Sequence, residues 1–222
     1  MIDKQTTIDT RFFIRSFPVG PLGCNCTILG DTVTGQAIVA DPGGNADEIL
    51  ETLQAAGLTL TRIIHTHAHF DHFLASGELH ELTGAPLCLH PADKPLWEML
   101  EMQCARFRIP YKPVPEPHQW LEDNESLVAG ELTGEALWTP GHSPGSMSFS
   151  FEAINLLIAG DTLFKGGVGR TDLWGGNAAS LAQSIRQRLY TLDESTTVIA
   201  GHGPTTTLGE EMRFNPHIRV GK

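Results

Sequence analysis

The stretch HTHAHFDH, residues 65–72, places four histidines and one aspartate within eight positions. The apolar, β-branched run TRII precedes it, so we expect the cluster to emerge from the end of a strand. Imidazole and carboxylate groups at alternating positions suit zinc, with iron or manganese as alternatives. A ligand set that began at His65 would place Phe70 where a ligand is needed. A set that begins at His67 reads HxHxDH, so we predict that His65 instead lies buried beneath the site.

The composition limits the classes of protein to which the chain can belong. The chain has 222 residues and is 41% hydrophobic, which suits one domain over residues 1–222 with one sizeable core. The net charge of -11 opposes tight binding to nucleic acid, which needs clustered Lys and Arg. No apolar signal region opens the chain, and no apolar run approaches the roughly 20 residues that span a bilayer. We therefore expect a cytoplasmic protein that binds neither membrane nor nucleic acid.

Strand and helix signals occur in two similar halves. The strand-like runs lie at 11–17, 24–30, 36–44, 61–64, 85–90, 125–130, 134–140, 145–152, 154–161 and 196–204. Helices are expected over 45–57, about 71–83, 92–107 and 177–192. Asn45 would cap the first helix together with Glu48, and Gly84 would stop the second. Antiparallel-type strands followed twice by helices favour two sheets stacked face to face with helices outside.

The run THAHFDH resembles the THxHxDH signature of the metallo-β-lactamase superfamily. Further motifs of that superfamily follow in the expected order as TPGHSPGS at 139–146, LIAGDTLF at 157–164 and IAGHGP at 199–204. The four motifs together cover most of the chain. The resemblance implies the fold class α+β, as an αββα four-layer sandwich of the metallo-β-lactamase type. Its active site would lie in a cleft at one edge of the sandwich.

The same resemblance implies two adjacent divalent metal ions, most simply Zn²⁺, with Fe or Mn as alternatives. The first ion would be held by His67, His69 and His142. The second would be held by Asp71, His72 and His202, and Asp161 would bridge the two. Asp71 would also act in catalysis by orienting the attacking hydroxide. The set has no missing member, which indicates an active enzyme.

Three stretches narrow the resemblance to the glyoxalase II branch, namely NCTIL, residues 160–176 and residues 201–216. Within that branch the chain looks closest to the short bacterial hydroxyacylglutathione hydrolases of the GloC type. A metal-bridging hydroxide would then cleave a thioester such as S-D-lactoylglutathione to a hydroxy acid and a free thiol. Arg170 falls where relatives carry a basic residue that meets the glycyl carboxylate of glutathione. We assign Lys165, in the same Gly-rich run, to substrate binding as well.

Two departures from glyoxalase II keep other functions open. The chain ends soon after His202, so we expect no C-terminal helical domain with further glutathione contacts. Asp172 stands where glyoxalase II has tyrosine, and the sequence GRTD also occurs in persulfide dioxygenases. The alternatives are therefore a mononuclear-iron persulfide dioxygenase of the same fold, or a hydrolase of another small ester or thioester.

Overall fold

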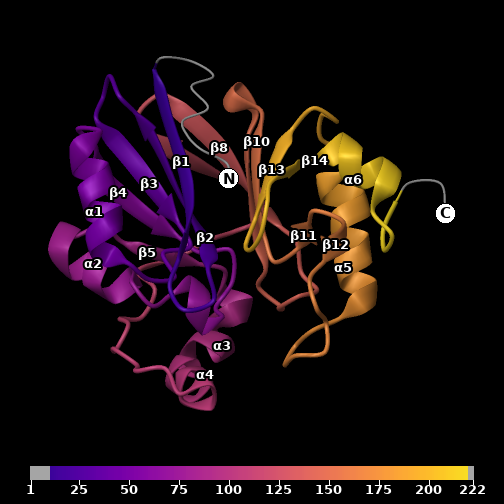
Figure 1. Ribbon diagram of the computed structural model, residues 1–222, viewed down its shortest axis with the longest axis horizontal. Helices are drawn as coiled ribbons and strands as arrows, with labels where there is room; N and C mark the ends of the chain where they lie inside the picture. Colours follow the sequence, from indigo (N-terminus) through magenta and orange to yellow (C-terminus); the bar gives the residue numbers. More distant parts are fainter. Residues whose placement is uncertain (1–10, 220–222) are drawn as a thin grey trace.

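The computed structural model describes residues 11–219 and folds them around two six-stranded sheets. In spatial order, the first sheet contains β1 (Phe12–Val19), β2 (Cys24–Asp31), β3 (Gln36–Ala40), β4 (Thr59–Ile64), β5 (Leu87–Leu89) and β6 (Gln119–Trp120). The second contains β14 (Thr206–Thr207), β13 (Thr197–Ala200), β10 (Leu156–Gly160), β9 (Met147–Phe151), β8 (Leu132–Trp138) and β7 (Glu125–Ala129). A two-stranded hairpin pairs β11 (Leu163–Phe164) with β12 (Gly167–Val168). In Figure 1 the two sheets lie at the centre and helices occupy the outer flanks.

The strand directions differ in part from the expectation. β1, β2 and β3 form the predicted antiparallel meander. From β3 to β6 the pairing is parallel, and so is that of β10 with β13. The expected antiparallel-type pairing therefore holds for β1 to β3 and for β7 to β10, but not for these other neighbours. Helices connect β3 to β4, β4 to β5 and β10 to β13, and such crossovers are what parallel neighbours require.

Helices cover the outer face of each sheet. The first sheet carries α1 (Ala46–Ala55) and α2 (Ser76–Thr83), with α3 (Lys94–Glu98) and α4 (Leu100–Phe107) at its lower end. The second carries α6 (Leu208–Phe214) and α5 (Ala178–Ser184), which continues as a π-helical turn over Ile185–Leu189.

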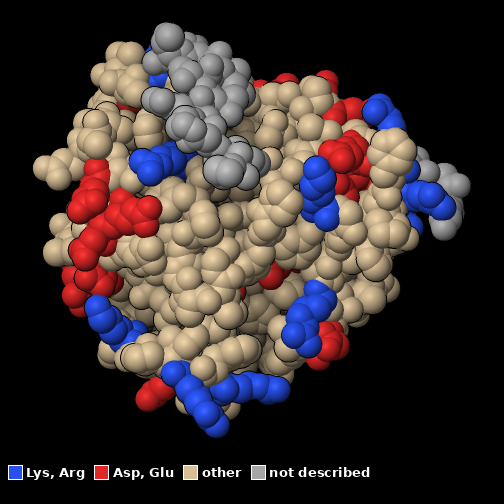
Figure 2. All heavy atoms as spheres, in the orientation of Figure 1, with Lys and Arg blue, Asp and Glu red and all other residues tan. Residues whose placement is uncertain are grey.

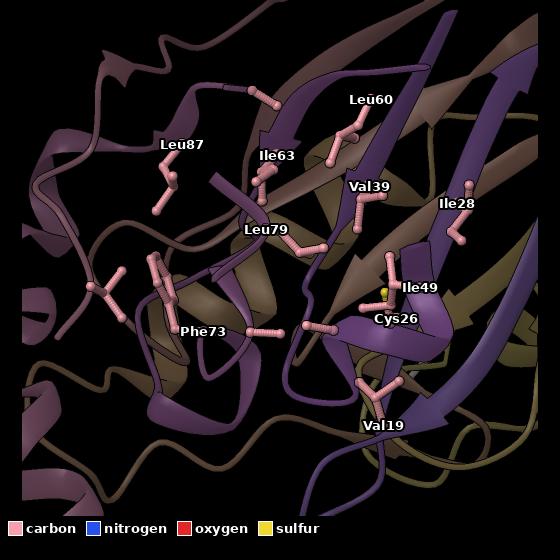
Figure 3. Close-up of a cluster of buried hydrophobic side chains, with 14 of the residues drawn as sticks. Val19, Cys26, Ile28, Val39, Ile49, Leu60, Ile63, Phe73, Leu79 and Leu87 are labelled. Carbon is pink, nitrogen blue, oxygen red and sulfur yellow. The ribbon is translucent and has the colours of Figure 1, made fainter. Parts of the chain in front are cut away.

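Three separate apolar clusters hold these layers together. Figure 3 shows the first, in which Val39 and Ile63 of the sheet pack with Ile49 of α1 and Leu79 of α2. A second cluster fills the space between the sheets, and a third lies between the second sheet and α5 and α6. Three cores between four layers confirm the predicted α+β, αββα sandwich.

Several helix ends differ from the sequence-based expectation. Asn45 lies at the start of α1, but its φ is 55° and its side chain caps no helical N–H. Its carboxamide instead donates to Glu48 and accepts from the Gly20 N–H, which joins the helix to the β1–β2 turn. The helix expected over about 71–83 begins only at Ser76. The one expected over 92–107 divides at Met99 into α3 and α4.

Charge is distributed unevenly over the face that Figure 2 shows. Acidic side chains gather along the edge formed by α1 and α2, whereas basic side chains lie over α4. All four cysteines are buried and unpaired. In the part of the chain that the structure describes, no helix is long and apolar enough to cross a membrane.

Candidate metal centre

The structure brings all seven predicted ligands to one edge of the sandwich. His67 and His69 follow the end of β4, and Asp71 and His72 lie in a 3₁₀ turn just beyond. The other three follow strands of the second sheet: His142 comes after β8, Asp161 after β10 and His202 after β13. Both sheets therefore contribute, although the motifs lie far apart in the sequence.

Three imidazoles form the first cluster, which we call the three-histidine group: His67, His69 and His142. The Nε2 atoms of His67 and His142 each lie 3.0 Å from Nδ1 of His69. Tetrahedral zinc with Zn–N bonds near 2.05 Å would separate its nitrogen ligands by about 3.3 Å. The observed spacing is close to that value, so the three nitrogens face a common point at which a cation fits.

A second cluster, which we call the Asp71 group, consists of Asp71, His72 and His202. Nε2 of His202 lies 3.1 Å from Oδ2 of Asp71, and Nε2 of His72 lies 3.9 Å from the same oxygen. His72 is fully buried, whereas His202 keeps a 28% exposed side chain. This group therefore opens toward solvent on the His202 side.

Asp161 lies between the two groups. Its Oδ1 is 3.7 Å from Nε2 of His72, and its Oδ2 is 3.6 Å from Nε2 of His142. Among the described residues, Oδ1 of Asp161 and Nε2 of His72 are buried without a hydrogen-bond partner. Buried polar atoms without partners are costly unless something occupies the space between them. A carboxylate that turns one oxygen to each cluster fits a pair of divalent cations.

Hydrogen bonds to the far ring nitrogens select the tautomer that metal binding needs. Nδ1 of His142 donates to the Arg170 carbonyl at 2.8 Å, and Nδ1 of His67 lies 3.1 Å from the Thr66 hydroxyl. Nδ1 of His72 lies 3.0 Å from Oδ2 of Asp41. The neutral form of each ring therefore carries its proton on Nδ1, and Nε2 is directed toward the cluster.

The ionisation states also suit a metal. Burial, reinforced by the neighbouring imidazoles, lowers the pKa of His67 well below its usual range and that of His69 to about 3. Burial alone would raise the pKa of Asp71, but His72 and His202 hold it at about 2. At neutral pH His67 and His69 are thus neutral and Asp71 is ionised, which are the forms that bind cations. Against the effect of burial, Cys24, Asp41 and Asp71 raise the pKa of His72, and the hydrogen bond with Asp71 raises the pKa of His202. A cation bound to the Asp71 group would therefore displace protons from these two rings.

Sequence reasoning missed Asp41, which lies behind both groups. Its Oδ2 accepts from His72 and, at 2.6 Å, from the Thr66 hydroxyl that contacts His67. Oδ1 accepts from the Thr66 backbone N–H. Cys24 adds a contact of 3.4 Å from Sγ to Nδ1 of His72. An acidic residue directly after the strand QAIVA was the available signal.

Asn25 of the NCTIL motif positions the loop that carries His202. Its side-chain amide donates to the carbonyls of Ala200 and Gly203, both at 2.9 Å, and its backbone N–H donates to that of Gly201. A strand of the first sheet thereby holds a ligand loop of the second. Nothing in the sequence placed Asn25 beside His202.

Close packing explains one glycine of the IAGHGP motif. A Cβ at Gly201 would lie 2.0 Å from Oδ1 of Asp161 and 3.0 Å from Cε1 of His72. Real side chains do not approach this closely, so residue 201 must be glycine if Asp161 is to face both groups.

His65 lies beneath the cluster, as expected of a buried residue that is no ligand. Its Nε2 is 2.7 Å from the Ser76 hydroxyl, Nδ1 is 3.0 Å from the Cys88 carbonyl, and its ring stacks on Phe73 at 3.6 Å. His65 thus joins the end of β4 to β5 and α2.

The two residues assigned to substrate binding lie near the Asp161 segment. Nε and Nη2 of Arg170 donate to the two carboxylate oxygens of Asp172, and both side chains are largely exposed. Lys165, in the turn between β11 and β12, lies 3.7 Å from a carboxylate oxygen of Glu210. Both positively charged side chains thus face carboxylates of the same chain.

A separate hollow of about 580 Å³ lies beside the outward face of β7, β8 and β9. Its lining includes Thr133, Glu135, Ser150 and Asn155 and none of the seven ligands. The chemistry-bearing residues are therefore not in this hollow.

Comparison with known proteins places the chain in a family. A sequence profile of the Metallo-beta-lactamase superfamily matches residues 19–202. The chain belongs to this superfamily. It is 39% identical to a probable metallo-hydrolase, YqgX of Bacillus subtilis, over 92% of this chain and 96% of that one. It is 35% identical to the hydroxyacylglutathione hydrolase GloC of Haemophilus influenzae, over 92% and 97%.

Solved structures agree with this placement. BLEG-1, a B3 metallo-β-lactamase, superposes with a TM-score of 0.85 at 35% identity, covering 92% of this chain and 98% of that one. TTHA1623 in a di-iron-bound form gives 0.82 at 36%, with 91% and 98% covered. ETHE1 from Myxococcus xanthus gives 0.78 at 29%, with 93% and 84% covered. With its His/Asp cluster, the chain is a metallo-hydrolase of this superfamily, and its cluster suits divalent metal ions.

Proposed function

We propose that the protein is a two-metal thioester hydrolase that cleaves substrates of the S-D-lactoylglutathione type. The seven residues His67, His69, Asp71, His72, His142, Asp161 and His202 would hold the two ions. The observation that carries this proposal is the Asp161 carboxylate, which turns one oxygen to each group of ligands. A single-ion site would need no such shared carboxylate.

Two divalent cations bound here would supply a hydroxide at neutral pH and polarise the scissile carbonyl. Asp71 would orient the attacking water with its carboxylate, which His202 holds at 3.1 Å. The Arg170 carbonyl and the Thr66 hydroxyl would keep His142 and His67 in the required tautomer. No nucleophilic side chain would be needed, because hydroxide itself would attack the carbonyl. The departing thiolate, from a thiol with a pKa near 8.5, is already a good leaving group.

Arg170 is proposed to bind the carboxylate of a glutathione-derived substrate. The guanidinium is exposed and its partner Asp172 is two residues away, so solvent screening makes the pair weak. A substrate carboxylate could replace Asp172 at little cost. Lys165 would add a second positive charge nearby, and the similarity to GloC supports a glutathione-derived ligand.

The test is hydrolysis of S-D-lactoylglutathione by purified protein of measured metal content. We expect loss of thioester absorbance with wild type and none with His67→Ala, a variant that removes a ligand without touching Arg170. Protein that contains two ions per chain but hydrolyses no thioester would contradict the proposal. Hydrolysis of a thioester without a carboxylate at an equal rate would contradict the role of Arg170.

Persulfide oxidation is the second candidate, because this chain carries GRTD and is similar to ETHE1. That chemistry would use one iron on two histidines and one carboxylate. Oxygen uptake with glutathione persulfide, together with one iron per chain, would favour it over hydrolysis.

A further inference from the structure

One buried carboxylate outside the ligand set connects the two loops that carry the three-histidine group. Asp93 is fully buried at the start of α3. Its Oδ2 accepts from the Ala68 N–H at 3.0 Å and from the Ser143 hydroxyl at 2.8 Å, and its Oδ1 accepts from the Gly145 N–H at 2.6 Å. Ala68 lies between His67 and His69, and Ser143 directly follows His142.

The orientation of Asp93 is unusual for its place in the chain. An aspartate at the first position before a helix ordinarily accepts a hydrogen bond from that helix's own N–H groups. Asp93 makes no such bond. Both of its oxygens are instead directed to the two ligand loops. Burial raises the pKa of the Asp93 carboxyl, and the donors from Ser143, Ala68 and Gly145 oppose that rise.

Gln103 of α4 completes the arrangement from the other side of the loop. Its side-chain amide donates to the Ala68 carbonyl at 3.1 Å, and its carbonyl oxygen accepts from the Phe70 N–H at 3.0 Å. The Gln103 side chain thus holds the peptide groups on both sides of His69.

Packing leaves Asp93 little freedom to move. A Cβ at Gly145 would lie 2.6 Å from the Asp93 backbone nitrogen and 2.8 Å from its Cγ. The motif TPGHSPGS therefore needs glycine at 145 so that the His142 loop can approach Asp93. None of the hydrogen bonds of Asp93 reaches Asp71, His72 or His202.

We propose that Asp93 is a positioning residue for one metal ion only: it sets the three-histidine group and leaves the Asp71 group unaffected. This inference rests on the proposed two-ion centre. Gln103 assists by fixing the peptide groups around His69. Hydrogen-bonding partners of metal-binding loops typically change metal affinity by about 10- to 100-fold.

The experiment measures ion affinity in two backgrounds that each keep a single group. His202→Ala disables the Asp71 group, and His142→Ala disables the three-histidine group. Zn²⁺ competition titrations are then run with and without Asp93→Asn. We expect Asp93→Asn to weaken Zn²⁺ binding about 10- to 100-fold in the His202→Ala background and by less than about twofold in the His142→Ala background.

Asp31→Asn provides a matched control. Asp31 is also fully buried and also accepts backbone hydrogen bonds, from Val33 and Glu131, but it lies at the far end of β2 from Cys24. Asp31→Asn should lower the melting temperature of the protein. It should not weaken Zn²⁺ binding more in one background than in the other. If Asp93→Asn does not fold, Ser143→Ala can replace it, because it removes one hydrogen-bond donor to Asp93. This variant should also weaken Zn²⁺ binding mainly in the His202→Ala background, but by a smaller factor.

Two outcomes would overturn the inference: equal weakening in both backgrounds, or no change in either. Failure of the proposed function is distinct from both, since it would appear in the unmodified protein as a single bound ion or as absent thioester hydrolysis.

Discussion

The two ligand groups are held by different residues. In the three-histidine group, Asp93 and Gln103 bind the backbone around Ala68, and the Arg170 carbonyl accepts from His142. In the Asp71 group, the supporting residues belong to the first sheet or directly follow one of its strands. Asp41 contacts His72, and Asn25 holds the His202 loop. If each group holds one ion, as proposed, the two sites should lose their ions separately, although they would share Asp161.

The largest effect is expected from removing a ligand of the three-histidine group. His67→Ala should lower thioester hydrolysis by about 10³-fold or more, because a polarising cation contributes several kcal/mol. Zinc analysis should show one ion fewer per chain. Retention of two tightly bound ions would contradict the assignment of His67.

Gly201→Ala should disturb both groups at once. The added methyl would displace Asp161 and press on His72, and a misplacement of about 1 Å can cost about 10²-fold in rate. Gly203→Ala is the control within the same loop, since a Cβ there meets nothing within 4 Å. Gly203 has a φ of +78°, so this variant should lose about 1 kcal/mol of stability yet keep its ions. Equal rates for both variants would show that the contact with Asp161 does not matter.

Asp41→Asn should act mainly on the Asp71 group. The hydrogen bond that it accepts from His72 is direct, whereas His67 is reached only through Thr66. We expect Zn²⁺ affinity to fall about 10- to 100-fold in the His142→Ala background and less in the His202→Ala background. A larger loss of Zn²⁺ affinity in the His202→Ala background would contradict the assignment of Asp41 mainly to the Asp71 group.

The smallest effects concern Arg170 and Asp172, which lie outside both groups. Arg170→Gln should raise KM for S-D-lactoylglutathione about 5- to 10-fold with kcat unchanged, as expected for one exposed charged hydrogen bond. Asp172→Asn should lower KM, because it removes the carboxylate that competes for Arg170. A change in kcat alone would place both residues in a different role.

The sequence predicted which residues come together at the site, but not the residues that hold them in place. His67 to His72 are contiguous and follow a recognisable strand, so their register could be deduced from the residues themselves. Asp93 and Gln103 contact Ala68 only because α3 and α4 fold back onto the loop. Such contacts depend on tertiary structure, which no local pattern encodes.

Two predicted helix starts also differ from the structure. Asn45 and Glu48 have the spacing of a capping box, yet the Asn45 side chain binds Gly20 across the β1–β2 turn. The helix expected from Asp71 starts only at Ser76, after a separate 3₁₀ turn over Phe70–His72. At Asn45, a distant partner replaced the local hydrogen bond that the sequence pattern predicts.

The central claim is that Asp161 joins two complete ion sites. Metal analysis of the purified, zinc-loaded protein tests it most directly, with Asp161→Asn measured in parallel. We predict two ions per chain in the unmodified protein and weaker binding of both in the variant. One ion per chain, or two ions unaffected by Asp161→Asn, would contradict the account.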